Sequence, residues 1–347
     1  MPPYENLDDL PTAPGRYHAH LPVARDLSGR GVGIDVIVHQ GAEPGPTLTV
    51  LSGMHGDEWL HLEFFRRLDS ELAPDALRGR LLLVPMANAA AFANQMRNVL
   101  HEADAPDMNR VFPVTARPQN GLPEQLAAKL AHEVLARSDA LLDFHLGIWG
   151  STLASSIVGT DFTDPSVSAR SQELALVFGL PLVYQAKMMS VFPGPRAAQA
   201  YVGEVLKIPS CGSFHGGAGF DSDLEDDWMN ANYRGIRNVM RHLGMEDGAI
   251  ERPERYLVYE TVQRVNPRNG GYLRPERRRD TFGREVRAGE LLGKVISPFT
   301  FETVEELRAP VDGYLGYWAR NYPVHPGDWA FAVVPRDHAG TRWIEAG

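Results

Sequence analysis

Two short polar motifs, each placed directly after an apolar run, most constrain how this chain of 347 residues can fold. The first is His55-Gly-Asp-Glu58, which follows the apolar, partly β-branched run 47–51. The second is His145, which lies at the end of an apolar run that begins at Leu141. Short runs of this kind are typical of buried strands. If both are strands of one sheet, their carboxyl ends can bring two imidazoles and a carboxylate together.

Two histidines and a glutamate are a ligand set of catalytic zinc, which takes three protein ligands and leaves a fourth position open for water. The sequence therefore predicts one zinc ion per chain, bound by His55, Glu58 and His145. Each half of the pattern also has a more ordinary interpretation. A lone His-x-x-Glu often occurs by chance, and a histidine that ends an apolar run is more often a hydrogen-bonded core or loop residue. The joint pattern at two strand ends favours the metal site.

Neighbouring residues support this interpretation. Gly53 and Gly56 permit a tight exit from the strand, and Glu58 is expected in the first turn of the following helix. Asp143 stands two residues before His145, so on a strand both side chains face the same way. We therefore expect Asp143 to orient the histidine through a hydrogen bond.

Strands and helices alternate along most of the chain, which indicates an α/β fold with a sheet covered on both faces. Apolar or alternating runs predict strands near 31–39, 47–51, 80–85, 181–185 and 208–213. Helical spacing of apolar residues predicts helices near 57–68, 122–137, 165–178 and 228–243.

The pattern changes after about residue 255, because the later apolar runs are strand-like and no convincing helix follows. These runs are 256–265, 286–295 and 309–315. The last two resemble the barrel-sandwich modules of biotinyl and lipoyl carriers. A carrier needs a lysine at the hairpin between its halves, whereas Lys294 lies inside the first half, so we expect no carrier function. The sequence predicts a catalytic domain, 1–255, and a small all-β, barrel-sandwich-like C-terminal domain, 256–347.

Four stretches match known family signatures in order. Gly53–Glu58 matches Gly-x-His-Gly-(Asp/Asn)-Glu, and Asp143–His145 matches Asp-x-His. Asp107–Pro113 matches Asp-Leu-Asn-Arg-x-Phe-Pro, and 85–97 matches the segment that leads to an upstream arginine. On these residues the chain resembles the aspartoacylase/succinylglutamate desuccinylase family, in particular its bacterial predicted-deacylase branch, a relative of zinc carboxypeptidases. The resemblance covers about residues 30–335.

The resemblance implies a mixed central sheet flanked by helices and a zinc-dependent deacylase. Such an enzyme would hydrolyse an amide bond of a small N-acyl amino acid or a related anionic or zwitterionic metabolite. It also implies that Arg97, Asn109 and Arg110 bind the substrate. The rigid fork of donors on Arg110 suits a carboxylate or a developing oxyanion, which gives this residue a catalytic role as well. The alternative for any single arginine is a surface salt bridge, which contributes little.

The chain departs from the family at the general base. The family places a glutamate in a segment like Ile-Pro-Ala-x-Thr-x-Glu-x-Gly-Gly-x-Gly, and in the corresponding stretch, 208–219, Phe214 takes its place. A phenyl ring cannot accept a proton. His215 is our first candidate for a replacement base, although strand alternation points it away from the side of Phe214 unless a bulge at Gly216 re-aims it. Glu225 and the two acidic residues after it are further candidates, for which a solvated helix start is the more ordinary interpretation.

This departure leaves two other functions open. The same scaffold could hydrolyse a different amide or an ester, or act without that base. The chain could also be a non-catalytic, zinc-containing binding protein.

Composition and charge indicate which classes of partner this chain can bind. A net charge of −10 argues against a sequence-independent grip on nucleic acid, which needs a basic face. No apolar run approaches the roughly 20 residues that span a bilayer, so we expect no membrane partner. The single cysteine, Cys211, and an N-terminus without a visible secretory signal fit a cytoplasmic protein. We expect a small-molecule substrate as the partner, and a homo-oligomer is left open.

Overall fold

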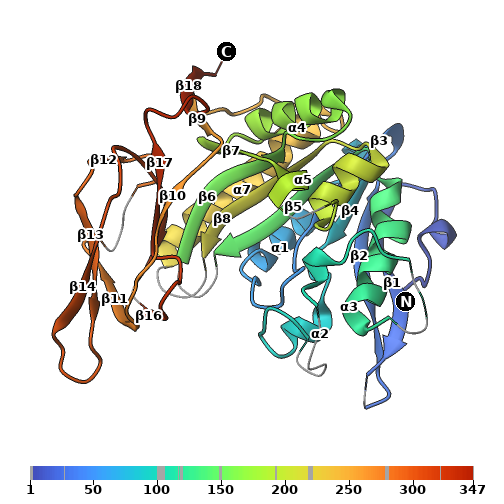
Figure 1. The fold of residues 1–347 in the computed structure, drawn as a ribbon. Helices are drawn as coiled ribbons and strands as arrows, with labels where there is room; N and C mark the ends of the chain where they lie inside the picture. The colour runs from blue at the N-terminus through green and yellow to red at the C-terminus, as the bar shows by residue number, and fades with distance from the viewer. Residues whose placement is uncertain are drawn as a thin grey trace.

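The computed structural model describes residues 3–26, 28–99, 106–115, 117, 120–147, 151–191, 194–217, 222–277, 281–320 and 322–346. Its centre is a sheet in which seven neighbouring strands follow the order β1-β2-β4-β3-β5-β8-β6 (Figure 1). In chain order these are β1 (Gly15–Arg25), β2 (Gly31–Gln40), β3 (Glu43–Leu51), β4 (Arg78–Val84), β5 (Ala140–Gly147), β6 (Ser151–Gly159) and β8 (Ser210–Gly217). Strands β4, β3, β5 and β8 are parallel to one another, whereas β1 pairs antiparallel with β2, β2 with β4, and β6 with β8. The predicted mixed α/β sheet is confirmed.

The register of the parallel strands brings their carboxyl ends to one edge. Leu51, the last residue of β3, pairs with Asp143 on β5, and His145 pairs with Phe214 on β8. All eight residues of β5 are buried, as expected for a parallel strand that is covered on both faces. The two motifs that follow β3 and β5 in the sequence therefore meet at the same edge.

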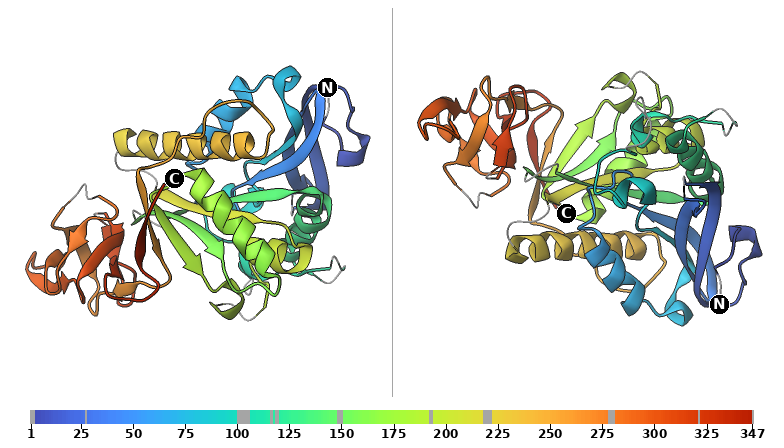
Figure 2. Two further views of the ribbon diagram at one scale, coloured as in Figure 1. Left: turned by 90° about the horizontal axis from the view of Figure 1, so that it is seen from above. Right: turned by 90° about the horizontal axis from the view of Figure 1, so that it is seen from below.

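Helices cover both faces of this sheet. On one face lie α1 (Leu62–Glu71), α4 (Pro165–Phe178) and α7 (Ser222–His242). Figure 2 shows α1 and α7 side by side along that face. The other face carries α3 (Leu122–Lys129), which continues through the helical turns Leu130–Val134 and Leu135–Arg137, and α6 (Ala198–Tyr201), which continues through Val202–Leu206. Shorter pieces are α2 (Ala89–Phe92), α5 (Met188–Val191) and the turns Leu7–Asp9, Pro74–Ala76 and Met108–Arg110.

Each face has its own apolar core, and β5 supplies both. Leu142, Phe144 and Leu146 belong to the core under α1, α4 and α7, whereas Leu141 belongs to the core under α3 and α6. Because side chains alternate along a strand, Asp143 and His145 share the side of Leu141. The polar residues of β5 thus face α3 and α6.

The residues after α7 contain strands and, within the described part of the chain, no helix. Strands β15 (Gly313–Ala319), β17 (Phe331–Pro335) and β10 (Gln263–Val265) continue the central sheet beyond β6, and β12 (Glu285–Val286) pairs with β15. A second, antiparallel sheet has the order β14-β13-β11-β16, with β11 (Gly271–Pro275), β13 (Leu291–Ile296), β14 (Thr303–Arg308) and β16 (Tyr322–Val324). The expected all-β C-terminal region is confirmed.

The boundary between residues 255 and 256 stays a prediction. Directly after it, β9 (Arg255–Tyr259) pairs in parallel with β7 (Leu182–Ala186), which in turn pairs with β6 of the central sheet. Strand β18 (Arg342–Glu345) pairs with β9. Among the described residues, no helix combines the length and the apolar character that crossing a membrane requires.

Two predicted helices begin elsewhere than expected. The helix expected from residue 57 begins at Leu62, because the preceding segment forms turns in which the Glu58 amide donates to the carbonyl of His55. Glu58 therefore lies in a turn before α1, not in its first turn. The helix expected from residue 228 begins earlier, at Ser222.

A buried arginine ties the C-terminal strands to the site end of β8. Arg320 follows β15 and is 5% exposed. Its Nη2 donates to the carbonyl of Gly217 at 2.9 Å and lies 3.6 Å from Glu225 Oε1 at the start of α7. A buried charge is tolerated only when it is paired and hydrogen-bonded, and Arg320 meets both conditions.

Replacing Arg320 by Met should lower the free energy of unfolding by about 2–4 kcal/mol, because the carboxylate of Glu225 and the carbonyl of Gly217 lose a buried partner. The matched control is Arg336→Met, which removes an exposed ion pair with Glu285 at 3.3 Å and should cost less than about 1 kcal/mol. Urea unfolding of both variants measures the difference. Equal losses would mean that the buried pair contributes no more than the surface pair.

Candidate metal centre

The carboxylate of Glu58 lies between two imidazoles at the site edge of the sheet. Its Oε1 is 2.8 Å from His55 Nδ1 and its Oε2 is 2.8 Å from His145 Nδ1. One potential ligand atom from each of the three residues lies within 4.8 Å of the others, and none of the three residues is more than 3% exposed. The structure thus brings together the three residues that the sequence nominated as metal ligands.

The chain reaches this arrangement through two glycines. Gly53 has φ +67°, and a Cβ at this position would lie 2.4 Å from Met86 Sδ. A Cβ at Gly56 would lie 2.2 Å from the backbone carbon of Ala91 in α2. Real Cβ atoms do not approach other atoms so closely, so the turn that carries His55 and Glu58 requires glycine at both positions.

Each imidazole also has a carboxylate at its second ring nitrogen. His55 Nε2 lies 3.0 Å from Asp107 Oδ1, and His145 Nε2 lies 3.4 Å from Asp143 Oδ2. Asp107 is held in turn by Arg97 Nη2 at 2.9 Å and by the Asn109 amide at 2.8 Å. Carboxylates at Nε2 fix the tautomer and the ring orientation, so that Nδ1 of each ring is directed at Glu58.

This donor set fits a divalent metal ion. Two Nδ1 atoms and a carboxylate converge, and the two outer carboxylates would strengthen the imidazoles as ligands. Mixed nitrogen and oxygen donors on rigid strand ends suit first-row divalent metals. The group can therefore hold such an ion.

The electrostatics of the group point the same way. Burial opposes protonation of His145, but the charges of Asp143 and Glu58 prevail and raise its pKa to about 10. Burial likewise works against the charged form of Glu58, but the two imidazoles hold its pKa well below the ordinary value. The carboxylate is thus ionised at neutral pH, and a dication can replace the protons that the imidazoles otherwise carry.

The three predicted substrate-binding residues surround this group. Asn109 Nδ2 lies 3.3 Å from His145 Nε2, and Asn109 Oδ1 accepts from the amide of Ala198 in α6. Arg110 Nη1 donates to the Asn109 carbonyl at 2.6 Å. Arg97 Nη1 lies 3.7 Å from Glu58 Oε1. The turn Met108–Arg110 and the segment before it therefore form a polar, cationic side of the site.

Phe214 covers the ring of His145 from the neighbouring strand. The two ring centroids are 4.7 Å apart and the rings are nearly parallel, at 24°. Phe214 is also the only residue of β8 that is not buried. A phenyl ring therefore stands beside the candidate metal ligand His145, at the position where the resemblance places the family's proton-accepting glutamate.

The structure does not bring His215 to this group. Its ring lies on the opposite face of β8, with ring centroids 6.4 Å from Trp228 of α7 and 6.5 Å from Phe282. Burial lowers the pKa of His215 to about 3. The geometry gives no support to a role for His215 as the base, and that role stays a prediction. Glu225 lies at the start of α7 beside Arg320, in keeping with the interpretation as a helix start.

Sequence reasoning did not nominate Asp107 as a site residue, although its carboxylate contacts His55, Arg97 and the Asn109 amide. The available signal was its place as the first residue of the matched stretch Asp107–Pro113. His61 is a further buried histidine near the site, with Nδ1 2.8 Å from Ser52 Oγ. Burial lowers the pKa of His61 to about 3, so it is neutral at physiological pH.

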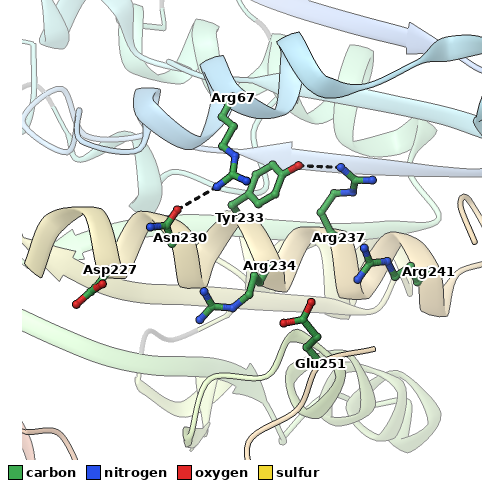
Figure 3. A pocket seen from close by; sticks show the side chains of 8 residues that line it. All are labelled: Arg67, Asp227, Asn230, Tyr233, Arg234, Arg237, Arg241 and Glu251. Carbon is green, nitrogen blue, oxygen red and sulfur yellow. Dashed lines mark hydrogen bonds between the residues drawn. The ribbon is translucent and has the colours of Figure 1, made fainter. Parts of the chain in front are cut away.

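A hollow of about 470 Å³ lies elsewhere, along α7 on the other side of the sheet (Figure 3). Four arginines contribute to its lining, and three of them pair with acidic neighbours. Arg67 pairs with Glu71 at 2.8 Å, Arg237 with Glu246 at 2.7 Å, and Arg241 with Glu246 at 3.2 Å. Arg67 lies above the ring of Tyr233 (Figure 3), and its guanidinium carbon is 3.9 Å from the ring centroid. Arg67 also donates to Asn230 Oδ1 at 3.0 Å, and the Tyr233 hydroxyl donates to Glu71 at 2.6 Å; these two contacts join α1 to α7. The Arg237–Glu246 pair joins α7 to the segment after it. The residues that line the hollow include none of the metal-ligand candidates.

Comparisons with known proteins agree with this geometry. The sequence matches the catalytic-domain model of the succinylglutamate desuccinylase/aspartoacylase family over residues 44–243. It is 28% identical over 331 residues to N-alpha-acetyl-L-2,4-diaminobutyric acid deacetylase of Halomonas elongata, which covers 90% of this chain and 89% of that protein.

Solved structures share the fold over nearly the whole chain. A succinylglutamate desuccinylase/aspartoacylase from Rhodobacter sphaeroides aligns with a TM-score of 0.75 at 25% identity, covering 94% of this chain and 98% of that one. The product-bound ectoine utilization protein EutE (DoeB) from Ruegeria pomeroyi aligns with a TM-score of 0.77 at 22% identity, also over 94% of this chain and 98% of that one.

Replacing Gly56 by Ala should destabilise the protein by at least about 2 kcal/mol, because the added methyl group meets backbone that cannot give way. The control is Gly31→Ala, where a Cβ meets nothing within 4 Å and the change in stability should stay within about 1 kcal/mol. Urea unfolding midpoints test both. A neutral Gly56→Ala variant would show that the turn carrying His55 and Glu58 can relax.

Proposed function

Because the chain belongs to the succinylglutamate desuccinylase/aspartoacylase family, we propose that it is a zinc-dependent hydrolase that removes the acyl group from a small N-acyl amino acid. The observation that carries the proposal is the buried convergence of His55, Glu58 and His145, with a carboxylate behind each imidazole. The Halomonas relative, a deacetylase by name, supports an amide bond as the target. The buried single cysteine, Cys211, is compatible with the cytoplasmic location that we also propose.

One zinc ion per chain would be held by Nδ1 of His55, Nδ1 of His145 and the carboxylate of Glu58. When bound, zinc supplies a water of lowered pKa and polarises a carbonyl group. Asp107 and Asp143 hold the imidazoles in the orientation that such binding needs. The burial of the two histidines, Glu58 and Asp143 keeps bulk water from competing for their hydrogen bonds.

The cationic side of the site would bind the negative end of the substrate. We assign the recognition of a carboxylate or of the developing oxyanion to Arg110, because its guanidinium offers a rigid fork of donors. Arg97, which pairs with Asp107, would support it. Asn109 fixes the backbone of this turn through its contact with α6 and lies beside His145. An N-acyl amino acid carries the carboxylate that such a site requires.

A second candidate function is a metal-containing protein that binds such a ligand without cleaving it. The observation in its favour is Phe214, which offers no proton acceptor beside His145. General-base assistance is worth about 10²–10⁴-fold in rate, so its loss would slow hydrolysis strongly while leaving binding intact. Turnover therefore separates the two candidates.

The protein purified with zinc should contain one zinc ion per chain and release free amine from a panel of N-acyl amino acids. Removing the metal with a chelator should abolish turnover, and added zinc should restore it. His145→Ala should lose stoichiometric zinc, whereas His132→Ala, at an exposed position on the turn Leu130–Val134, should keep it. Full zinc content in His145→Ala would overturn the ligand assignment. Stoichiometric zinc without turnover on amides or esters would favour the second candidate.

Replacing Arg110 by Lys should lower kcat/KM at least tenfold, about 1.4 kcal/mol, because lysine keeps the charge but loses the two-pronged donor geometry. Arg117→Lys, at an exposed position, is the matched control and should leave the kinetics unchanged. Zinc content must stay the same in both variants. Unchanged kinetics in Arg110→Lys would assign Arg110 a structural role only.

A further inference from the structure

We infer that Phe214 forms an apolar wall of the substrate site and selects ligands whose acyl group is an alkyl chain or an aromatic ring. The inference rests on the proposed function, because it assumes that the acyl group of a bound substrate lies near the metal ligands. It concerns the acyl part of the ligand, which would face Phe214. The amino-acid part would be bound by the cationic side of the site.

The first support is the place of the ring. Phe214 stacks on the metal-ligand candidate His145, with centroids 4.7 Å apart. It belongs to none of the apolar core clusters of the described residues, in contrast to Phe144 and Phe112. A partly exposed phenyl ring that packs in no core and touches a site histidine is placed to contact a ligand.

The second support is that no side chain at position 212 covers the ring. Gly212 lies two residues earlier on the same face of β8, and a Cβ there would lie 3.5 Å from Phe214 Cε2 and 2.9 Å from Gln199 Oε1. A side chain at position 212 would be in ordinary van der Waals contact with the ring and would crowd Gln199, which donates to the carbonyl of Ile157 on β6. Glycine at this position leaves that side of the ring uncovered.

The third support is the contrast between the two sides of the site. Asn109 and Arg110 lie on the turn Met108–Arg110, and Arg97 pairs with Asp107 directly before it. Phe214 stands on β8, across the ring of His145. A ligand with a carboxylate at one end and an apolar acyl group at the other matches this division. An acyl group that ends in its own carboxylate would place a charge against the phenyl ring, where burial without a partner is unfavourable.

The test uses the zinc-loaded full-length protein and the N-acetyl, N-butanoyl, N-hexanoyl, N-benzoyl and N-succinyl derivatives of glycine. Affinity is measured by titration calorimetry and turnover by release of glycine. Affinity should rise by up to about fourfold for each methylene that reaches the ring. N-Succinylglycine should bind at least tenfold more weakly than N-butanoylglycine.

In the variant Phe214→Ala, the gain in affinity for each added methylene should fall to less than about twofold. Its zinc content should stay at one ion per chain. Phe214→Leu keeps an apolar wall and should keep the order of affinities, which covers the case in which the alanine variant fails to fold. The matched control is Phe299→Ala, at a phenylalanine that is 90% exposed on the turn between β13 and β14. It should reproduce the wild-type series.

A flat series in the wild type, a steep series that survives Phe214→Ala, or no binding of any derivative would overturn the inference. These outcomes are distinct from failure of the proposed function. A Phe214-dependent order of affinities without release of glycine upholds the apolar wall and removes the hydrolase. Release of glycine that depends neither on the acyl group nor on Phe214 upholds the hydrolase and overturns the apolar wall.

Discussion

The structure depends on one buried carboxylate, that of Glu58, shared between His55 and His145. A buried charge is tolerated only with partners in good geometry. Of these partners, His55 lies in the turn that follows β3 and His145 lies on β5. The arrangement therefore requires β3 and β5 to be parallel neighbours in a fixed register, with Leu51 opposite Asp143. It also requires the turn Met108–Arg110 to bring Asp107 behind His55. Much of the central sheet can be understood as the frame that meets these conditions.

Two buried histidines on neighbouring strands show how strongly partners decide chemistry. His145 faces α6 with Asp143 and Glu58 beside it, and these charges outweigh burial and raise its pKa to about 10. His215 is equally buried on the opposite face, among aromatic rings, and burial lowers its pKa to about 3. Distance along the sequence made His215 the nearest candidate for a proton acceptor. Neighbouring residues on a strand point to opposite faces of the sheet, so His215 points away from the face that Phe214 shares with His145.

The sequence predicts those parts of the fold whose signals are local. The helix Pro165–Phe178 has its expected bounds, because Asp164 caps its start and Gly179, at φ +90°, ends it. The buried parallel strands are continuous apolar runs and were predictable for that reason. Strand β1 was not, because polar residues and Pro22 interrupt its apolar pattern. The start of α1 and the role of Asp107 depend on tertiary contacts to the metal-ligand turn, which no local pattern encodes. The three ligand candidates were found because their spacing is itself the signal.

Phe214 shows why fold and chemistry can vary separately in this scaffold. The pairing of His145 with Phe214 directs any side chain at this position toward the metal-ligand group, whatever its type. Phe214 belongs to none of the apolar core clusters of the described residues, so a different side chain here would remove none of that core packing. The same backbone position can thus present a proton acceptor or an apolar wall without disturbing the ligands. The buried group of His55, Glu58 and His145 could hold a metal ion, whereas Phe214 offers no proton acceptor beside His145. Function in this chain has to be argued from that residue as much as from its family.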